Sequence, residues 1–441
     1  MGSYTSPDWG PHGNEVRSLT REVRPLGLPV PAYGGRSIPN ITRSVVDAIG
    51  THLEGGPPLV PPLDRDLDPF HGGSAEGPVV VLLVDALGWG PFGGKGGRTG
   101  PPGPVPWQER ARPITTVFPT TTTAALTSLS TGTPPGRHGL GGYRQYLPRF
   151  GFVADLIRMS PLGLNAPESL VGPTWTPSLV SGAPSIFRRG VPGVALSRDR
   201  FAGTGFTRLL YDGAEYVPYG TASDMAHLLA QLLDRPRPPP VIYAYWDELD
   251  TVQHRRGPLP DLIRLEVDQL ARLIDFVRDH VGTRRRARTT LIITGDHGQV
   301  PATLAARIPI ERDPEIMALL SRPPAGDRRS GFFSATPGRL PALERVLRDR
   351  LPAGSRVISM TTALKGGLFG PPPFHPEIRD RLGDLLVLVP SPAGLTYLPP
   401  GGAPSTRYSL GAHGGLEADE LVVPLISGRL TDMASPAASS H

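Results

Sequence analysis

The sequence predicts an α/β protein: a three-layer α/β/α sandwich with a largely parallel central sheet and inserted cap elements. Apolar runs alternate with amphipathic helical segments along the chain, which is typical of this class. Three apolar runs lack polar alternation, as expected of strands that are buried on both faces of a parallel sheet. They occupy residues 78–90, 238–250 and 289–298, and each of them leads into aspartate.

The N-terminal part of the chain supplies the first predicted helix and strand. Residues 1–40 are rich in glycine, proline and polar residues, and we expect an N-terminal extension that wraps over the surface. Residues 41–50 (ITRSVVDAIG) predict a helix that ends at its glycine. The first apolar strand follows. The glycine-rich stretch at residues 90–104 lacks the phosphate-loop pattern and predicts a flexible loop.

The remaining elements continue the alternation of helix and strand. Residues 224–235 and 259–281 carry apolar residues at helical spacing, and each segment precedes an apolar strand. A helix at residues 340–351 and a last strand at residues 420–427 complete the pattern. We expect one α/β domain over residues 41–441. The irregular blocks at about residues 150–225 and 301–405 are expected to be cap-like insertions in that domain.

The composition of the 441-residue chain narrows the possible functions. The net charge is +5, but the arginines are scattered and no nucleic-acid-binding motif is present. The chain has no cysteine, which excludes disulfides, thiolate metal sites and a cysteine nucleophile. No apolar run approaches the roughly 20 residues of a membrane span, and the N-terminus shows no secretory signal. We therefore expect a soluble cytoplasmic protein without membrane contacts.

Acids and histidines follow the predicted strands in separate motifs. Taken singly, each motif also fits an ordinary structure: a surface ion pair in DELDTVQH, an Asx turn in TGDHG and a loop histidine in GAHGG. In open α/β sheets, however, ligands collect at the carboxyl ends of strands, so these side chains are expected to converge. Zinc accepts aspartate and histidine together, and two metal ions suit an in-line displacement. The candidate ligands are Asp85, Asp250, His254, Asp296, His297 and His413.

Five segments together resemble the alkaline phosphatase superfamily, in its nucleotide pyrophosphatase/phosphodiesterase branch. They are VVVLLVDALG, VFPTTTTAALTSLSTGTPPGRHGL, YWDELDTVQHRRGP, LIITGDHG and GAHGG, and they follow the family's order. The resemblance implies that residues 41–441 form an alkaline phosphatase-like catalytic domain with two divalent metal ions. Zn²⁺ is the first choice, and Mn²⁺ or another ion is the alternative. The implied ligands of one ion are Asp250, His254 and His413, and those of the other are Asp85, Asp296 and His297.

The resemblance also implies a threonine nucleophile beside the second ion. Thr122 lies nine residues before the threonine of the Thr-Gly pair at residues 131–132, and it fits the family's order of proline, threonine, any residue and nucleophile. The family's proline after the nucleophile is Ala124 here, which leaves Thr121 and Thr123 as alternatives. The implied reaction is the hydrolysis of a phosphodiester or nucleotide pyrophosphate through a covalent phosphothreonine.

The substrate-binding positions depart from the family pattern. Tyr143 and Arg144 stand near the place of an asparagine that diesterases of the family often carry. Arg144 is a candidate donor to phosphate oxygens, and equally a candidate surface residue. The implied substrate is a small phosphate ester or a nucleotide. A phosphomonoesterase or phosphonate hydrolase of the same superfamily remains an alternative, as does a non-catalytic relative that binds a phosphorylated ligand or metal.

Overall fold

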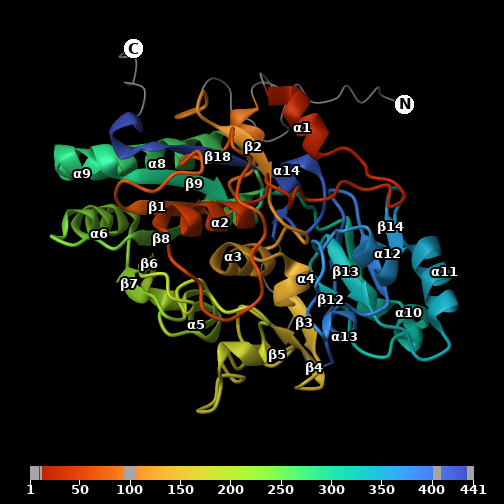
Figure 1. Ribbon diagram of the computed structural model, residues 1–441. Coiled ribbons are helices and arrows are strands. Elements are labelled where there is room, and N and C mark those ends of the chain that lie inside the picture. Colours follow the sequence, from red (N-terminus) through yellow and green to blue (C-terminus); the bar gives the residue numbers. More distant parts are fainter. Residues whose placement is uncertain (1–8, 10–11, 94–104, 401–408, 435–441) are drawn as a thin grey trace.

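The computed structural model describes residues 9, 12–93, 105–400 and 409–434. The described residues therefore omit part of the expected N-terminal extension, most of the glycine-rich loop and the end of the second irregular block. Two seven-stranded sheets dominate the described fold. Figure 1 shows the first, which includes β1, β8 and β9, on the left, and the second around β13 and β14 on the right.

The first sheet is largely parallel, as predicted. Neighbouring strands β9, β1, β8, β6 and β7 pair in parallel, and only β18 runs against its neighbours in the described sheet. The three predicted apolar strands are its centre. In sheet order the strands are β2 (Arg112–Thr115), β18 (Val422–Arg429), β9 (Thr290–Gly295), β1 (Val79–Val84), β8 (Val241–Trp246), β6 (Gly193–Arg198) and β7 (Glu215–Tyr219).

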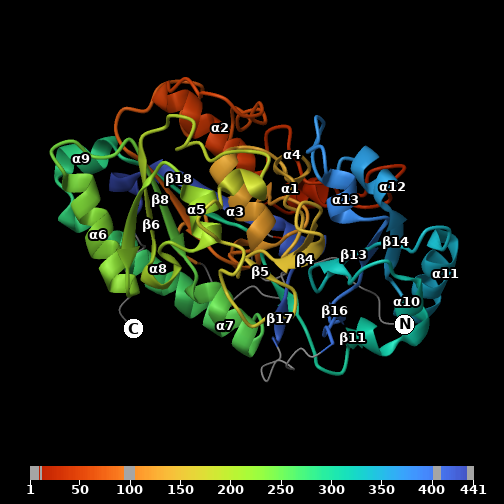
Figure 2. The same cartoon turned by 90° about the horizontal axis from the view of Figure 1, so that it is seen from below.

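Helices cover both faces of this sheet, so the predicted three layers are confirmed. Successive side chains of β1 enter two different cores, because a strand directs alternate residues to opposite faces. One core includes α6 (Ala222–Asp234) and α8 (Pro260–His280). The other includes α2 (Ile38–Ile49), α3 (Thr122–Thr131) and α5 (Gly205–Tyr211). Figure 2 shows α2 and α3 on one side of the strands and α8 on the other.

The second sheet was not predicted from the sequence. Its pairs are antiparallel, and it draws strands from both irregular blocks. In sheet order they are β14 (Arg356–Ser359), β15 (Leu385–Leu388), β13 (Ser330–Phe333), β12 (Ala325–Gly326), β3 (Arg144–Leu147), β4 (Phe152–Asp155) and β5 (Ser160–Pro161). The associated helices are α10 (Pro314–Leu319), α11 (Leu340–Arg350), α12 (Met360–Lys365) and α13 (Ile378–Leu382).

Neither irregular block forms a single structural unit, because each block contributes strands to more than one sheet. The first block forms β4 and β5 of the second sheet, and then β6 and β7 of the central sheet. The second block forms much of the second sheet and contributes to two short ladders. These ladders pair β10 (Val300–Pro301) with β17 (Gly411–Ala412), and β11 (Arg307–Pro309) with β16 (Gly394–Thr396).

The helices begin and end where local chemistry favours it. Helix α2 begins three residues before the predicted start, because Ser37 and Asn40 form a reciprocal capping box. It ends at Gly50, whose left-handed backbone (φ 70°) suits glycine. Thr221 caps α6 by accepting from the Asp224 backbone. The remaining helices are α1 (Gly13–Leu19), α4 (Pro135–His138), α7 (Glu248–Arg256), α9 (Thr283–Arg288) and α14 (Ala418–Leu421).

Candidate active site

The six candidate ligands converge at one edge of the central sheet. Strands β9, β1 and β8 are parallel neighbours, so their carboxyl ends lie side by side. Asp85 directly follows β1, and Asp296 and His297 directly follow β9. Asp250 and His254 lie one turn apart on α7, the helix that follows β8. The pairing of β17 with β10 brings His413 to the same edge.

The first group consists of Asp85, Asp296 and His297, and it is buried. Their ligand atoms all lie within 4.8 Å of one another. His297 Nε2 is 3.3 Å from Asp296 Oδ2 and 3.6 Å from Asp85 Oδ1. Among the described residues, these two carboxylate oxygens have no hydrogen-bond partner, although both are buried. Buried charged oxygens without a partner are costly, and a bound cation removes that cost. The donor set therefore fits a divalent metal ion.

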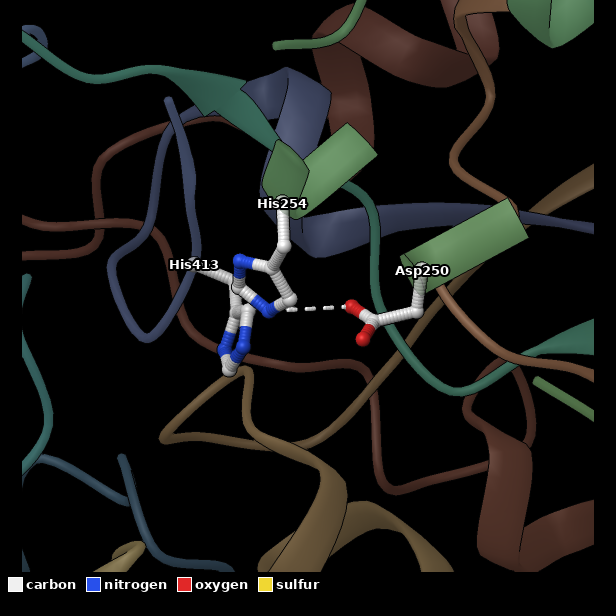
Figure 3. A group of neighbouring side chains, drawn as sticks. All are labelled: Asp250, His254 and His413. Atoms are coloured by element: carbon white, nitrogen blue, oxygen red, sulfur yellow. Dashed lines mark ion pairs between the residues drawn. The ribbon is translucent and has the colours of Figure 1, made fainter. Parts of the chain in front are cut away.

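The second group consists of Asp250, His254 and His413 (Figure 3), and its ligand atoms also lie within 4.8 Å of one another. Because Asp250 and His254 are four residues apart on α7, they share one face of the helix. His254 Nε2 lies 3.2 Å from Asp250 Oδ1, the pair joined by the dashed line in Figure 3. This group likewise has the nitrogen and oxygen donors that zinc accepts.

The three metal-site histidines share one contact, between ring atom Nδ1 and a backbone carbonyl oxygen. Backbone carbonyls accept from Nδ1, which fixes the ring and leaves Nε2 for a ligand, as is usual for metal-binding histidines. Each Nδ1 lies 3.1 Å from its carbonyl oxygen: His254 with Gly411, His297 with Gly298 and His413 with Thr120.

The two groups adjoin each other. The rings of His297 and His413 are stacked with centroids 4.0 Å apart, and the rings of His254 and His413 are 5.3 Å apart. The six side chains therefore form one cluster. It offers two adjoining sets of three ligands, each of which could hold one metal ion.

Electrostatics in the cluster reflect the crowding of carboxylates. Burial, together with the charges of Asp296 and Asp250, raises the pKa of Asp85 well above its usual value. Burial also raises the pKa of Asp296 to about 7, against the hydrogen bonds from backbone amides. Asp250 differs: burial acts to raise its pKa, but the charge of His254, the hydrogen bond with His254 and the charges of His413 and His297 together lower it. Burial lowers the pKa of His297 to about 4 and that of His413 to about 3, so both are neutral, ligand-competent rings at pH 7.

Thr122 is the threonine whose hydroxyl contacts the cluster. It is the first residue of α3, and its Oγ1 lies 3.1 Å from His297 Nε2. The hydroxyls of Thr120 and Thr121 bind elsewhere, to the Gly415 carbonyl at 3.0 Å and to Asp327 at 2.6 Å. Among the described residues, the Thr123 hydroxyl is buried without a hydrogen-bond partner.

Comparison with known proteins identifies the family of the chain. The family model for type I phosphodiesterase/nucleotide pyrophosphatase matches residues 108–415, more than half of the chain. The chain belongs to the type I phosphodiesterase/nucleotide pyrophosphatase family. It is therefore a hydrolase that acts on phosphoric ester bonds, within the alkaline phosphatase superfamily. No curated protein matches it in the sequence comparison.

Solved structures share the family fold at low sequence identity. Murine ectonucleotide pyrophosphatase/phosphodiesterase 5 matches with a TM-score of 0.58 and 17% identity, over 79% of this chain and 87% of the murine chain. An inactive variant of the murine protein in complex with AMP matches with a TM-score of 0.57 and 16% identity, over the same shares of both chains. Phosphonoacetate hydrolase from Sinorhizobium meliloti, in complex with phosphonoformate, gives 0.53 and 17%, over 80% of this chain and 90% of the other.

Of the helices in the described part of the chain, none combines the length and the apolar content that a membrane-spanning segment requires.

Tyr143 and Arg144, the predicted substrate-binding residues, lie at the start of β3. The Arg144 guanidinium donates to the carbonyl of Tyr397 at 3.0 Å. Burial and the neighbouring carboxylate of Asp155 raise the pKa of Tyr143, and Asp327 contributes in the same direction. These positions place the two residues on the second sheet, beside the turn that carries Asp327, and leave their role in binding a prediction.

Three residues that hold the cluster were missed in the sequence. The Tyr245 hydroxyl donates to Asp85 Oδ2, and Gln299 Nε2 donates to Asp250 Oδ1 at 2.6 Å. Asp327 accepts from Thr121 and lies 3.6 Å from His413. Tyr245 is part of an apolar strand and Asp327 lies in an irregular block, so neither has a local motif. Gln299 directly follows the TGDHG motif, and this position is the one sequence feature that could have indicated its contact with the cluster.

Proposed function

We propose that this hydrolase cleaves phosphodiesters or nucleotide pyrophosphates through a covalent phosphothreonine on Thr122, at a site for two divalent cations. The observation that carries the proposal is the Thr122 hydroxyl, 3.1 Å from His297 within the cluster of six ligands. Aspartate and histidine donors without cysteine suit Zn²⁺, and Mn²⁺ is the alternative. Bound cations would supply Lewis-acid charge that favours the threonine alkoxide and the leaving oxygen.

The position of Thr122 at the start of α3 supports its role as nucleophile. Backbone N–H groups of the first helical turn have no partner within the helix, and the helix dipole is positive there. A phosphoryl group bound at this end of the ten-residue helix α3 is favoured by both effects. The Thr122 hydroxyl lies 3.1 Å from His297 Nε2, so its oxygen is on the side of the helix that faces the cluster, next to the position of a cation bound by His297.

The reaction then has two displacements with balanced bonds. In the first, a bond forms between Thr122 Oγ1 and phosphorus while the bond from phosphorus to the leaving oxygen breaks, and the leaving group departs as an alcohol or phosphate. In the second, water attacks the phosphothreonine, the phosphoryl group leaves with the water oxygen, and the threonine hydroxyl is restored. Asp85, Asp296 and His297 would keep their positions through both steps and would hold the cation beside Thr122.

Two variants on the same helix turn test the nucleophile. Thr122→Ala is expected to reduce kcat for bis(p-nitrophenyl) phosphate by at least about 10³-fold, because the attacking oxygen is gone. Its zinc content is expected to remain at two ions, since the six main ligands are intact. The matched control is Thr123→Val, which removes a buried hydroxyl without a partner among the described residues and is expected to keep activity and fold.

The outcomes separate the alternatives. Activity retained by Thr122→Ala and lost by a variant of Thr121 or Thr123 would move the nucleophile by one residue. A wild-type protein that prefers p-nitrophenyl phosphate to the diester would point to a phosphomonoesterase. No turnover of either substrate by the zinc-loaded protein would contradict the proposed function.

A further inference from the structure

Asp327 extends into the cluster from the second sheet. It follows β12 in the turn before β13, whereas the aspartate ligands of the cluster follow strands of the first sheet. Its Oδ2 accepts from the Thr121 hydroxyl at 2.6 Å and lies 3.6 Å from His413 Nδ1. Its Oδ1 accepts from the Arg328 backbone N–H at 2.6 Å. The side chain is only 11% exposed.

The carboxylate of Asp327 therefore lies close to where a phosphoryl group must bind. Thr121 is the N-cap of α3 and immediately precedes Thr122. The hydroxyl that donates to Asp327 and the hydroxyl that would attack phosphorus therefore belong to adjacent residues, whose Cα atoms are about 3.8 Å apart. His413, the ring that Asp327 approaches, stacks on His297, which contacts Thr122. Two independent routes thus place the same carboxylate beside the site of attack.

The charge of this carboxylate acts differently on different phosphate esters. A monoester carries nearly two negative charges above its second pKa of about 6, whereas a diester carries one. Two of the hydrogen bonds to Asp327 come from neutral donors, a hydroxyl and a backbone amide, which leave its formal charge in place. Repulsion between like charges is stronger in a partly buried site than in water, and it is larger for the dianion.

We propose that Asp327 is a specificity-determining residue that disfavours dianionic phosphomonoesters relative to monoanionic diesters. This inference rests on the proposed function, because it needs Thr122 as the point of attack. Thr121 contributes by fixing the carboxylate against the start of α3. The substrates that the site selects are then esters with a single charge at the reacting phosphorus, including the diester-like phosphoanhydride of a nucleotide.

The test compares kcat/KM for bis(p-nitrophenyl) phosphate and p-nitrophenyl phosphate at pH 8 in the zinc-loaded protein. Asp327→Asn keeps the shape and an acceptor for Thr121 but removes the charge. It is expected to lower the diester-to-monoester ratio roughly 5- to 10-fold, mainly through faster monoester turnover. A third substrate, p-nitrophenyl phenylphosphonate, carries one charge and is expected to follow the diester.

Two further variants make the test decisive. Asp327→Ser also offers Thr121 an acceptor, and it is expected to shift the ratio in the same direction if the asparagine variant folds poorly. Asp313→Asn is the matched control: it makes the same charge change at the N-cap of α10, where it keeps its capping role, and the ratio is expected to stay unchanged.

An unchanged ratio in both Asp327 variants, with all substrates slowed equally, would overturn the inference and make the residue merely structural. That result would not contradict the proposed function, because the proposed function is tested by diester turnover of the wild-type protein and not by the substrate ratio of the variants. Absence of diester turnover in the wild type would instead contradict the proposed function and, with it, the inference.

Discussion

At the scale of single residues, the threonine run shows how similar side chains take different roles. The hydroxyl of Thr122 faces the cluster, and those of Thr120 and Thr121 donate hydrogen bonds to neighbouring segments. The Thr123 hydroxyl is buried without a partner among the described residues. Sequence reasoning identified the run and favoured Thr122 by register. It had no means to assign Thr121, because the partner Asp327 is 206 residues away.

Tyr245 is the residue whose hydroxyl orients Asp85 from the neighbouring strand. We predict that Tyr245→Phe weakens zinc binding about 10- to 100-fold, because Asp85 then loses the donor that holds its second oxygen. Zinc affinity measured by competition with a chelator checks this.

Tyr243→Phe provides a control for Tyr245 on the same strand. The Tyr243 hydroxyl contacts Thr42 and the Leu129 carbonyl, and both partners belong to the core between α2 and α3. Loss of these contacts is expected to lower the free energy of unfolding by about 1 kcal/mol and to leave zinc affinity unchanged. Equal zinc affinities for the wild type and Tyr245→Phe would show that Asp85 needs no such support.

At the scale of elements, the strand ends were predictable and the second sheet was not. The central strands are continuous apolar runs, and the acids after them were recognisable for that reason. The strands of the second sheet are two to four residues long and come from distant segments. Such short strands are defined by their partners, which no local pattern contains. Asp327 lies in one of their turns and was missed together with them.

The turn after β9 depends on the close approach of backbones. A Cβ on Gly298 would lie 2.0 Å from the Asp419 carbonyl oxygen, and the Gly298 amide donates to the Glu420 carbonyl. We predict that Gly298→Ala lowers the free energy of unfolding by about 1–3 kcal/mol, since backbone has to move. Zinc affinity is expected to fall as well, because Gly298 also supplies the carbonyl that orients His297.

Gly172→Ala serves as the comparison, because no heavy atom of the described part of the chain lies within 4 Å of the added Cβ. Its stability is expected to change by no more than about 0.5 kcal/mol. Urea unfolding of both variants measures the difference. A Gly298→Ala protein as stable as the wild type would mean that the turn accommodates the methyl group.

At the scale of the whole molecule, the site depends on both sheets. The first sheet supplies five of the ligands through the segments that follow β1, β8 and β9, and the second sheet supplies Asp327. Between them, Arg329 and Glu420 form a fully buried ion pair, and Glu420 also accepts from the Gly415 amide next to the His413 loop. The placement of the ligands is therefore a property of the fold as a whole.

The carboxylates in this cluster make metal-dependent stability sensitive to pH. Burial raises the pKa of Asp296 to about 7, so this carboxyl holds a proton in the metal-free protein below neutral pH, and burial raises the pKa of Asp85 in the same direction. A cation has to displace these protons, and its affinity falls as the pH falls through 7. Above pH 7 the Asp296 carboxylate is ionised without a compensating cation, which lowers the stability of the metal-free fold. Both effects increase the difference in the free energy of unfolding between metal-bound and metal-free protein as the pH rises.

We therefore predict that chelation lowers Tm strongly at pH 8 and only weakly at pH 5.5. Each proton that the ion displaces weakens binding up to tenfold per pH unit, or about 1.4 kcal/mol of the stabilisation that ligand binding provides. Melting curves with zinc and with chelator at both pH values measure the two shifts. Asp296→Asn is the control, because it removes the titrating group, and it should show a small shift that varies less with pH. Equal shifts at pH 5.5 and pH 8 in the wild type would contradict the coupling between proton and metal at this cluster.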